Sequence, residues 1–274
     1  MTGLRRQLQV RLRLAVMRAG SLYMRTRRIE ALLRLWAKRP HERDFRALAG
    51  LRHEHGPFLD IGANAGLAAV SFRIYHPDAP IVSIEPNPAH ERDLRFVGRY
   101  LGNFKYLGCG ASDRNGEATL YIPRYRSFSL TPLASFDRDF VTSEHRQTVL
   151  FGKPLDDSDF SVDEERVPIR RLDDLDLAPA IVKVDVEGHE LPVLRGLERT
   201  LRNHRPVVLV EWSREFAPIQ RFLEERGYNL FVAGHRSARL EPFDGSNRHL
   251  NIFCVPAEGG VEPRRSDVRA AVRS

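Results

Sequence analysis

Short apolar runs alternate with amphipathic stretches along most of the chain after Pro57. The short runs are typical of buried strands, and the stretches with apolar residues three and four positions apart are typical of helices. We expect strands at residues 58–61, 81–84, 104–108, 181–186, 207–210, 228–232 and 250–255. We expect helices at residues 67–75, 88–101, 189–201 and 218–226. This order predicts an α/β fold, a doubly wound and mainly parallel sheet with helices on both faces.

The alternation is interrupted between the third strand and residue 180. Residues 118–122 predict an extra strand and residues 167–170 an edge strand. Residues 123–166 mix charged, small and aromatic side chains without a clear period. A long stretch of this kind inside a compact domain is usually a functional loop, so we expect a loop or lid there.

The chain before the sheet has a helical pattern. Residues 4–39 carry apolar side chains at steps of three and four, Gly20 and Ser21 can separate two helices, and Pro40 limits the second. We therefore divide the chain into a basic helical extension at residues 1–45 and an α/β domain at residues 46–256. Residues 257–274 are charged and rich in small side chains, which predicts a disordered tail.

The net charge of +7 is concentrated at the N-terminus. Residues 1–39 hold eleven arginines and lysines against a single acid, Glu30. Because apolar and basic side chains interleave at helical spacing, we favour peripheral contact of residues 1–39 with an anionic membrane and expect no nucleic-acid partner. A helical cap packed on the domain, or a solvated arm, is the alternative. The oligomeric state is left open.

Cysteine content and hydropathy bear on the compartment. Cys109 and Cys254 lie in strand-like stretches without C-x-x-C spacing, so we expect buried, reduced thiols. No apolar run is long enough for a transmembrane helix, and no secretory signal is evident. We expect a cytoplasmic protein that can contact the inner face of the membrane.

The segment 60–66, Asp-Ile-Gly-Ala-Asn-Ala-Gly, joins the first predicted strand to the first helix. Glycines there let the backbone turn tightly and approach a ligand. A dinucleotide-binding loop needs three glycines spaced G-x-G-x-x-G, whereas this segment has two, four residues apart, after Asp60. An acid at that position suits a cationic ammonium group, such as the methionine part of S-adenosylmethionine. An ordinary strand–helix turn is the alternative.

Two further groups of acids follow predicted strands. Glu85 ends the second strand, where a carboxylate can accept both hydroxyl protons of a ribose; a surface acid at a helix start is the alternative. Lys183, Asp185 and Glu187 alternate at the end of the strand at 181–186, so they share one side of it. Ionisable groups beside a buried strand are costly unless they pair or perform chemistry. A purely structural Lys183–Asp185 ion pair also fits.

These motifs together resemble the FkbM-like family of S-adenosylmethionine-dependent methyltransferases, over most of residues 58–255. The resemblance implies a Rossmann-like, seven-stranded sheet whose last strand is antiparallel. It implies that Asp60, Gly62, Asn64 and Gly66 frame the methionine part of S-adenosylmethionine, that Glu85 holds the ribose, and that the turn containing Asp113 contacts adenine. The implied acceptors are hydroxyl groups of sugars, polyketides or other secondary metabolites, as small molecules or glycans.

For methyl transfer to a hydroxyl we assign the general base to Asp185, with Lys183 orienting it or stabilising developing negative charge. Glu187, His189 and Glu211 are the reserve candidates. Asp185, Glu187 and Glu211 could instead bind a hard divalent cation, although we expect no metal. A non-catalytic S-adenosylmethionine-binding or membrane-associated accessory protein is the main alternative function. A nicotinamide oxidoreductase is disfavoured by the missing third glycine.

Overall fold

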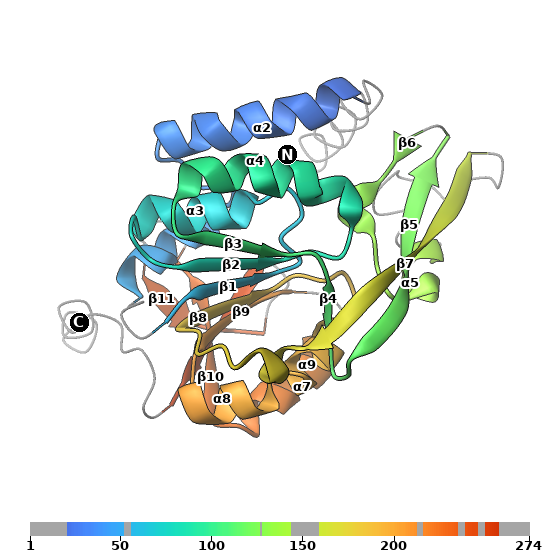
Figure 1. The fold of residues 1–274 in the computed structure, drawn as a ribbon. Coiled ribbons are helices and arrows are strands. Elements are labelled where there is room, and N and C mark those ends of the chain that lie inside the picture. Colours follow the sequence, from blue (N-terminus) through green and yellow to red (C-terminus); the bar gives the residue numbers. More distant parts are fainter. Residues whose placement is uncertain are drawn as a thin grey trace, which may run out of the picture.

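The computed structural model describes residues 21–51, 56–126, 128–143, 159–212, 216–234, 239–245 and 250–257 (Figure 1). The first predicted helix and nearly all of the predicted tail therefore lie outside the described residues. So does the centre of the predicted loop, at residues 144–158.

An eight-stranded sheet forms the centre of the molecule, in the order β11-β10-β12-β9-β8-β1-β2-β3. Its strands are β1 (Phe58–Ile61), β2 (Ile81–Ile84), β3 (Phe104–Leu107), β8 (Ile181–Val184), β9 (Val207–Glu211), β10 (Tyr228–Ala233), β11 (Leu240–Pro242) and β12 (Asn251–Pro256). The five neighbouring strands β3, β2, β1, β8 and β9 are parallel to one another. Strand β12 runs antiparallel to both β9 and β10. The predicted doubly wound α/β fold is confirmed, with β11 added at one edge.

Helices cover both faces of this sheet (Figure 1). One face carries α2 (Ser21–Trp36), the 3-10 helix η1 (Arg43–Gly50), α3 (Leu67–Tyr75) and α4 (Glu91–Leu101), and the other carries α7 (Glu190–Arg195), α8 (Glu198–His204) and α9 (Phe216–Glu224). Every residue of β1, β2 and β8 is buried, because alternate side chains enter two different core clusters. Strands that are covered on both faces consist of nearly uninterrupted apolar residues, so they could be recognised in the sequence.

The prediction of one continuous helix at residues 189–201 is wrong. The structure divides it into α7 and α8 around Gly196. A Cβ built on Gly196 would lie 2.0 Å from the backbone oxygen of Ser112, so the chain approaches the neighbouring strand too closely for a side chain there. Apolar periodicity continues across such a break, which is why the pattern did not reveal it.

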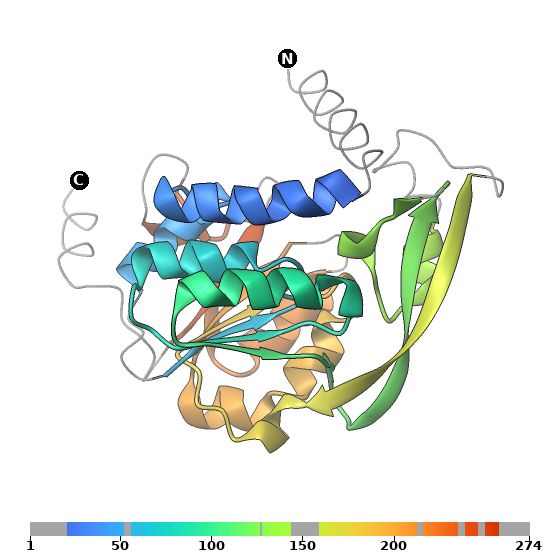
Figure 2. The ribbon, with the colours of Figure 1, turned by 45° about the horizontal axis from the view of Figure 1, so that its top comes forward.

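A second sheet lies beyond the carboxyl ends of the parallel strands (Figures 1 and 2). It has four strands in the order β4-β7-β5-β6. They are β4 (Gly110–Ser112), β5 (Gly116–Tyr125), β6 (Phe128–Ser129) and β7 (Phe160–Arg171), with the short helix α5 (Arg138–Thr142) in the connection. β5 and β7 form a long antiparallel ribbon, from the pair Gly116–Ile169 to the pair Tyr125–Phe160.

This ribbon corrects two predictions. Residues 123–166 are not a loop throughout, since β5 continues to Tyr125 and β7 begins at Phe160. Residues 167–170 are not an edge strand, because β7 lies between β4 and β5. Residues 163–166 are all exposed, so the strand shows no alternation of apolar and polar side chains there. The main signal for a half-buried strand is therefore missing.

The close approach at Gly196 gives a test of this architecture. We expect Gly196→Ala to lower the free energy of unfolding by about 3 kcal/mol, because the added methyl group meets backbone that cannot move aside. Gly50→Ala is the matched control, since a Cβ on Gly50 meets nothing within 4 Å. Urea unfolding followed by circular dichroism measures both, and equal stability of the two variants would contradict the packing described.

Candidate active site

The segment Asp60–Gly66 forms the turn between β1 and α3 and is held against the end of β8. Gly62 and Gly66 have φ of +78° and +83°, in the left-handed region that favours glycine. A Cβ on Gly62 would lie 1.8 Å from the backbone oxygen of Asp185. Gly62 therefore allows residues 60–66, the cofactor-loop candidate, to meet the Lys183–Glu187 segment.

Strand register aligns three polar residues across the sheet. Asp60 pairs with Ser83 on one side and with Lys183 on the other. Asp60 is fully buried, and its Oδ2 accepts a hydrogen bond from Ser83 Oγ at 3.2 Å. Burial raises the pKa of Asp60 to about 6, against the opposing charge of Lys183. Its Oδ1 has no hydrogen-bond partner among the described residues, which is a costly state for a buried carboxylate unless a ligand completes it.

Glu85 follows β2 and joins that strand to the cofactor-loop candidate. Its Oε2 accepts the Asn64 N–H and its Oε1 accepts the Asn87 N–H, both at 2.8 Å. Burial raises the pKa of Glu85 to about 7, although both N–H donors oppose the shift. The structure therefore brings Asn64 and Glu85, two predicted site residues, into direct contact.

Lys183 and Asp185 form an ion pair at the end of β8, with 2.7 Å between Nζ and Oδ2. Burial opposes the charged state of Lys183, but Asp185 and Asp60 together raise the lysine pKa above its ordinary value. Burial likewise raises the pKa of Asp185, and Lys183 and Glu211 outweigh that effect and hold it below its ordinary range. The structure contains the ion pair that the sequence allowed, and this pair keeps Asp185 ionised at the carboxyl end of β8.

Two more carboxylates adjoin Asp185. One oxygen from each of Asp185, Glu187 and Glu211 lies within 4.8 Å of the others. Glu187 has φ of +53°, and its backbone oxygen accepts a hydrogen bond from Ser135 Oγ at 2.7 Å. Burial and the neighbouring carboxylates raise the pKa of Glu211 to about 10, so Glu211 holds a proton at neutral pH.

The same three carboxylates are the residues that could bind a divalent cation. Oxygen ligands suit a hard cation, and their spacing permits shared coordination. A cation would have to displace the proton on Glu211 and compete with Lys183 for Asp185. Lys183 and the proton on Glu211 therefore offset two of the three carboxylate charges.

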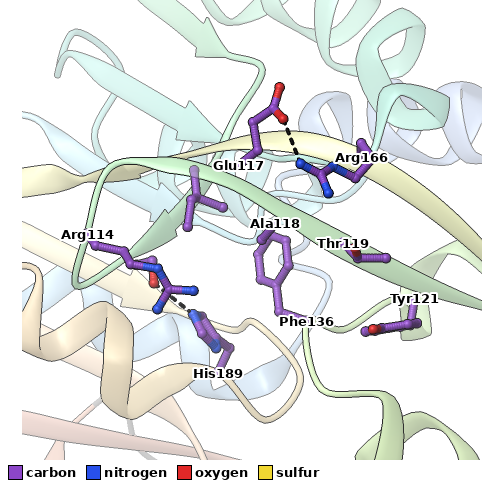
Figure 3. Close-up of a pocket in the computed structure, with 10 residues that line it drawn as sticks. Arg114, Glu117, Ala118, Thr119, Tyr121, Phe136, Arg166 and His189 are labelled. Carbon is purple, nitrogen blue, oxygen red and sulfur yellow. Dashed lines mark hydrogen bonds and ion pairs between the residues drawn. The ribbon is translucent and has the colours of Figure 1, made fainter.

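A cavity of about 320 Å³ lies between α7 and the β5–β7 ribbon (Figure 3). Its lining consists of Ser112, Arg114, Glu117, Ala118, Thr119, Tyr121, Phe136, Arg166, Ile169 and His189. Ser112 Oγ lies 3.1 Å from His189 Nε2 and donates to Asp113 Oδ1 at 3.3 Å. Asp113 thus lies beside this cavity, where it contacts Ser112 and Arg114 and raises the pKa of His189 against the effect of burial.

Residues before the α/β domain also reach the site, which the sequence did not reveal. Arg27 of α2 donates a hydrogen bond to Asn64 Oδ1. The Glu42 carboxylate accepts from Asn251 Nδ2 at 2.8 Å, and Asn251 pairs with Glu211 across β12 and β9. Burial lowers the pKa of His41 to about 3, and the charge of Lys183 adds to this effect. These side chains belong to no motif, so only their position in the fold identifies them.

Comparison with known proteins agrees with the motifs. A family model described as the methyltransferase FkbM domain matches residues 60–230. The antimetabolite synthetase AmbE of Pseudomonas aeruginosa is 33% identical over 240 residues, which cover 77% of this chain and 11% of AmbE. The hexuronic acid methyltransferase AglP of Haloferax volcanii is 28% identical over 184 residues, covering 66% of each protein.

A solved structure of an FkbM methyltransferase from Methylobacillus flagellatus aligns with 78% of this chain and 48% of its own, at 17% identity and a TM-score of 0.49. The chain thus spans about a tenth of AmbE and about half of that solved chain. The family match itself contains the turn after β1, Glu85 and the Lys183–Glu187 segment. The resemblance seen in the sequence is confirmed, and the chain belongs to the family of FkbM methyltransferase domains.

Proposed function

We propose that this protein is an S-adenosylmethionine-dependent methyltransferase that methylates a hydroxyl group of a sugar, polyketide or other secondary metabolite. The contact between Glu85 and Asn64 carries the proposal, because it joins an acid suited to a ribose with a turn suited to a methionine. The ion-paired Asp185 lies next to that turn, within the same crevice. Parallel α/β sheets bind ligands at this edge.

The residues present fit S-adenosylmethionine. The unpartnered Oδ1 of buried Asp60 can accept from the cationic ammonium of the methionine part. Gly62 and Gly66 hold the turn in the left-handed backbone conformation, and each lone pair of Glu85 not used by the backbone can accept from a ribose hydroxyl. S-adenosylmethionine supplies an electrophilic methyl group when bound.

The adenine end has a candidate place in the cavity beside Asp113. Ser112 and His189 offer polar atoms there, and the Phe136 ring lies 5.2 Å from the His189 ring, nearly perpendicular to it. A planar heterocycle needs an aromatic or apolar surface and a few hydrogen-bonding groups, and this lining provides both.

Proton removal is assigned to Asp185. Its carboxylate is ionised and can accept the proton that an acceptor hydroxyl gives up. Lys183 holds the carboxylate in place, while Glu211, already protonated, cannot be the base at neutral pH. The Glu187 carboxylate lies beside both acids and, after burial and Asp185, helps to raise the pKa of Glu211.

The acceptor class is supported by the names of relatives. AglP is named for hexuronic acids, and AmbE for the synthesis of an antimetabolite. A sugar hydroxyl or a secondary-metabolite hydroxyl fits both names. A chain that bound S-adenosylmethionine without turnover would not need the buried Lys183–Asp185 pair, which is costly to bury.

Cofactor binding should depend on Glu85. We expect S-adenosylmethionine and its demethylated product to bind the wild-type protein, NAD not to bind, and Glu85→Ala to weaken both interactions by about 100-fold through loss of charged hydrogen bonds. Isothermal titration calorimetry measures this, with Glu91→Ala, an exposed acid of α4, as the control. Binding of NAD alone would refute the proposal.

Methyl transfer should depend on Asp185 more than cofactor binding does. We expect Asp185→Asn to slow transfer by about 10²- to 10⁴-fold while retaining the affinity for S-adenosylmethionine. Transfer of labelled methyl to a panel of sugar and polyketide alcohols measures the rate, and Asp163→Asn, in the exposed part of β7, is the control. Full activity of Asp185→Asn would exclude Asp185 as the base, and absence of transfer by the wild-type protein to any acceptor would favour the accessory-protein alternative.

Stability should depend on pH through Glu211. A carboxyl group whose pKa is raised to about 10 binds more protons in the folded than in the unfolded state above its ordinary pKa, so its contribution is lost as pH rises toward 10. We therefore expect Glu211→Gln to become progressively more stable than wild type between about pH 5 and pH 8. Urea unfolding at several pH values checks this, with exposed Glu224→Gln as the control. A difference that stays constant with pH would contradict the buried, protonated state.

A further inference from the structure

Helix α2 has an apolar surface that the rest of the described structure leaves exposed. Ile29, Leu33 and Trp36 expose 57%, 58% and 85% of their surface, and their spacing places them on one side of the helix. The opposite side packs on α3 and α4 through buried residues such as Ala31 and Arg27. Both ribbon views show α2 as the outermost layer on this face of the molecule (Figures 1 and 2).

The concentration of these side chains is unusual within the molecule. Among the described residues the exposed large apolar side chains are Ile29, Leu33, Trp36, Tyr100 and Leu250, and three of them belong to this one helix. Single exposed apolar residues are ordinary, but a contiguous stripe marks a surface that contacts something apolar. Folding of the domain does not require the stripe, because α2 is already fixed through its other side.

The charge around the stripe is positive. Lys38 and Arg39 follow the helix directly and are exposed. Arg28 and Arg34 are already neutralised, by Asp93 at 2.5 Å and by Glu30 at 2.7 Å. The whole segment 1–39 carries eleven basic residues against one acid. Apolar side chains interleaved with basic ones suit an interface with anionic lipid, and tryptophan is favoured at the level of the headgroups.

We propose that α2 docks on an anionic membrane surface through Ile29, Leu33 and Trp36, with the exposed Lys38 and Arg39 contacting lipid headgroups. A second copy of the chain is a poorer partner, because pairing would bring two strongly basic segments together. Nucleic acid would attract the charges but offers no apolar phase to three clustered side chains. The proposal does not depend on the methyltransferase chemistry.

Helix α2 also contacts the cofactor-loop candidate. Arg27, on the buried side of the same helix, donates to Asn64 Oδ1, so a single element carries both the exposed stripe and a contact with the turn after β1.

The test uses the full chain and two matched variants. We expect the wild-type protein to co-sediment with vesicles containing phosphatidylglycerol and not with pure phosphatidylcholine vesicles. Replacement of Ile29, Leu33 and Trp36 by serine should weaken this binding by at least about tenfold. Leu250→Ser, which removes an equally exposed apolar side chain elsewhere, should bind as wild type does.

Fluorescence gives a second readout, because the chain has only two tryptophans, Trp36 and Trp212. In a Trp212→Phe background we expect the emission of Trp36 to shift to shorter wavelength on addition of the anionic vesicles. An unchanged spectrum, or equal vesicle binding by the triple-serine variant, would overturn the proposal. So would loss of thermal stability or of self-association in that variant, since the stripe would then be covered by this chain or by its copy. Binding of DNA without binding of vesicles would also overturn it.

Discussion

A lysine buried between two carboxylates organises this molecule. Lys183 lies next to Asp60 in the strand register and forms an ion pair with Asp185 two residues later. Each of these acids would be costly to bury without an opposite charge, and Lys183 provides that charge. In return, both acids raise the pKa of Lys183. The pairing of β1 with β8 brings the turn after β1 against the residues that follow β8. The three charged side chains therefore meet at the carboxyl ends of these two strands.

Backbone proximity then determines which residues can form that crevice. The carbonyl of Asp185 occupies the space where a side chain on Gly62 would be, so the two loops touch without intervening atoms. Glu85 binds the Asn64 N–H across the same turn and adds the end of β2 to the assembly. Glu211 contributes from β9 and retains a proton because burial, together with the charges of Asp185 and Glu187, raises its pKa. Charge and close packing thus arrange one ionised and one protonated carboxyl side by side.

The sequence correctly predicted the central strands of the large sheet, which are buried on both faces. Residues 58–61 and 81–84 were identified with their observed bounds, and the acids that follow them were assigned to the site. The outer part of β7 could not be predicted in the same way, because residues 163–166 are charged and exposed on both faces of the strand. The division of α7 from α8 depends on a backbone contact between Gly196 and Ser112, residues far apart in the chain. A single contact between residues far apart in the chain produces no periodic pattern of apolar residues in the sequence.

Contacts of the same kind explain why the flanking segments belong to the site. Arg27 and Glu42 precede the family match at residues 60–230, and Asn251 follows it. Arg27 nevertheless holds Asn64, and Glu42 holds Asn251 beside Glu211. The family motifs supply the edge of the sheet and its charges, while segments outside the motifs support the same turn and the same carboxylate from the other side. A segment that both exposes an apolar stripe and supports the turn can link the surroundings of the protein to its crevice without a separate domain.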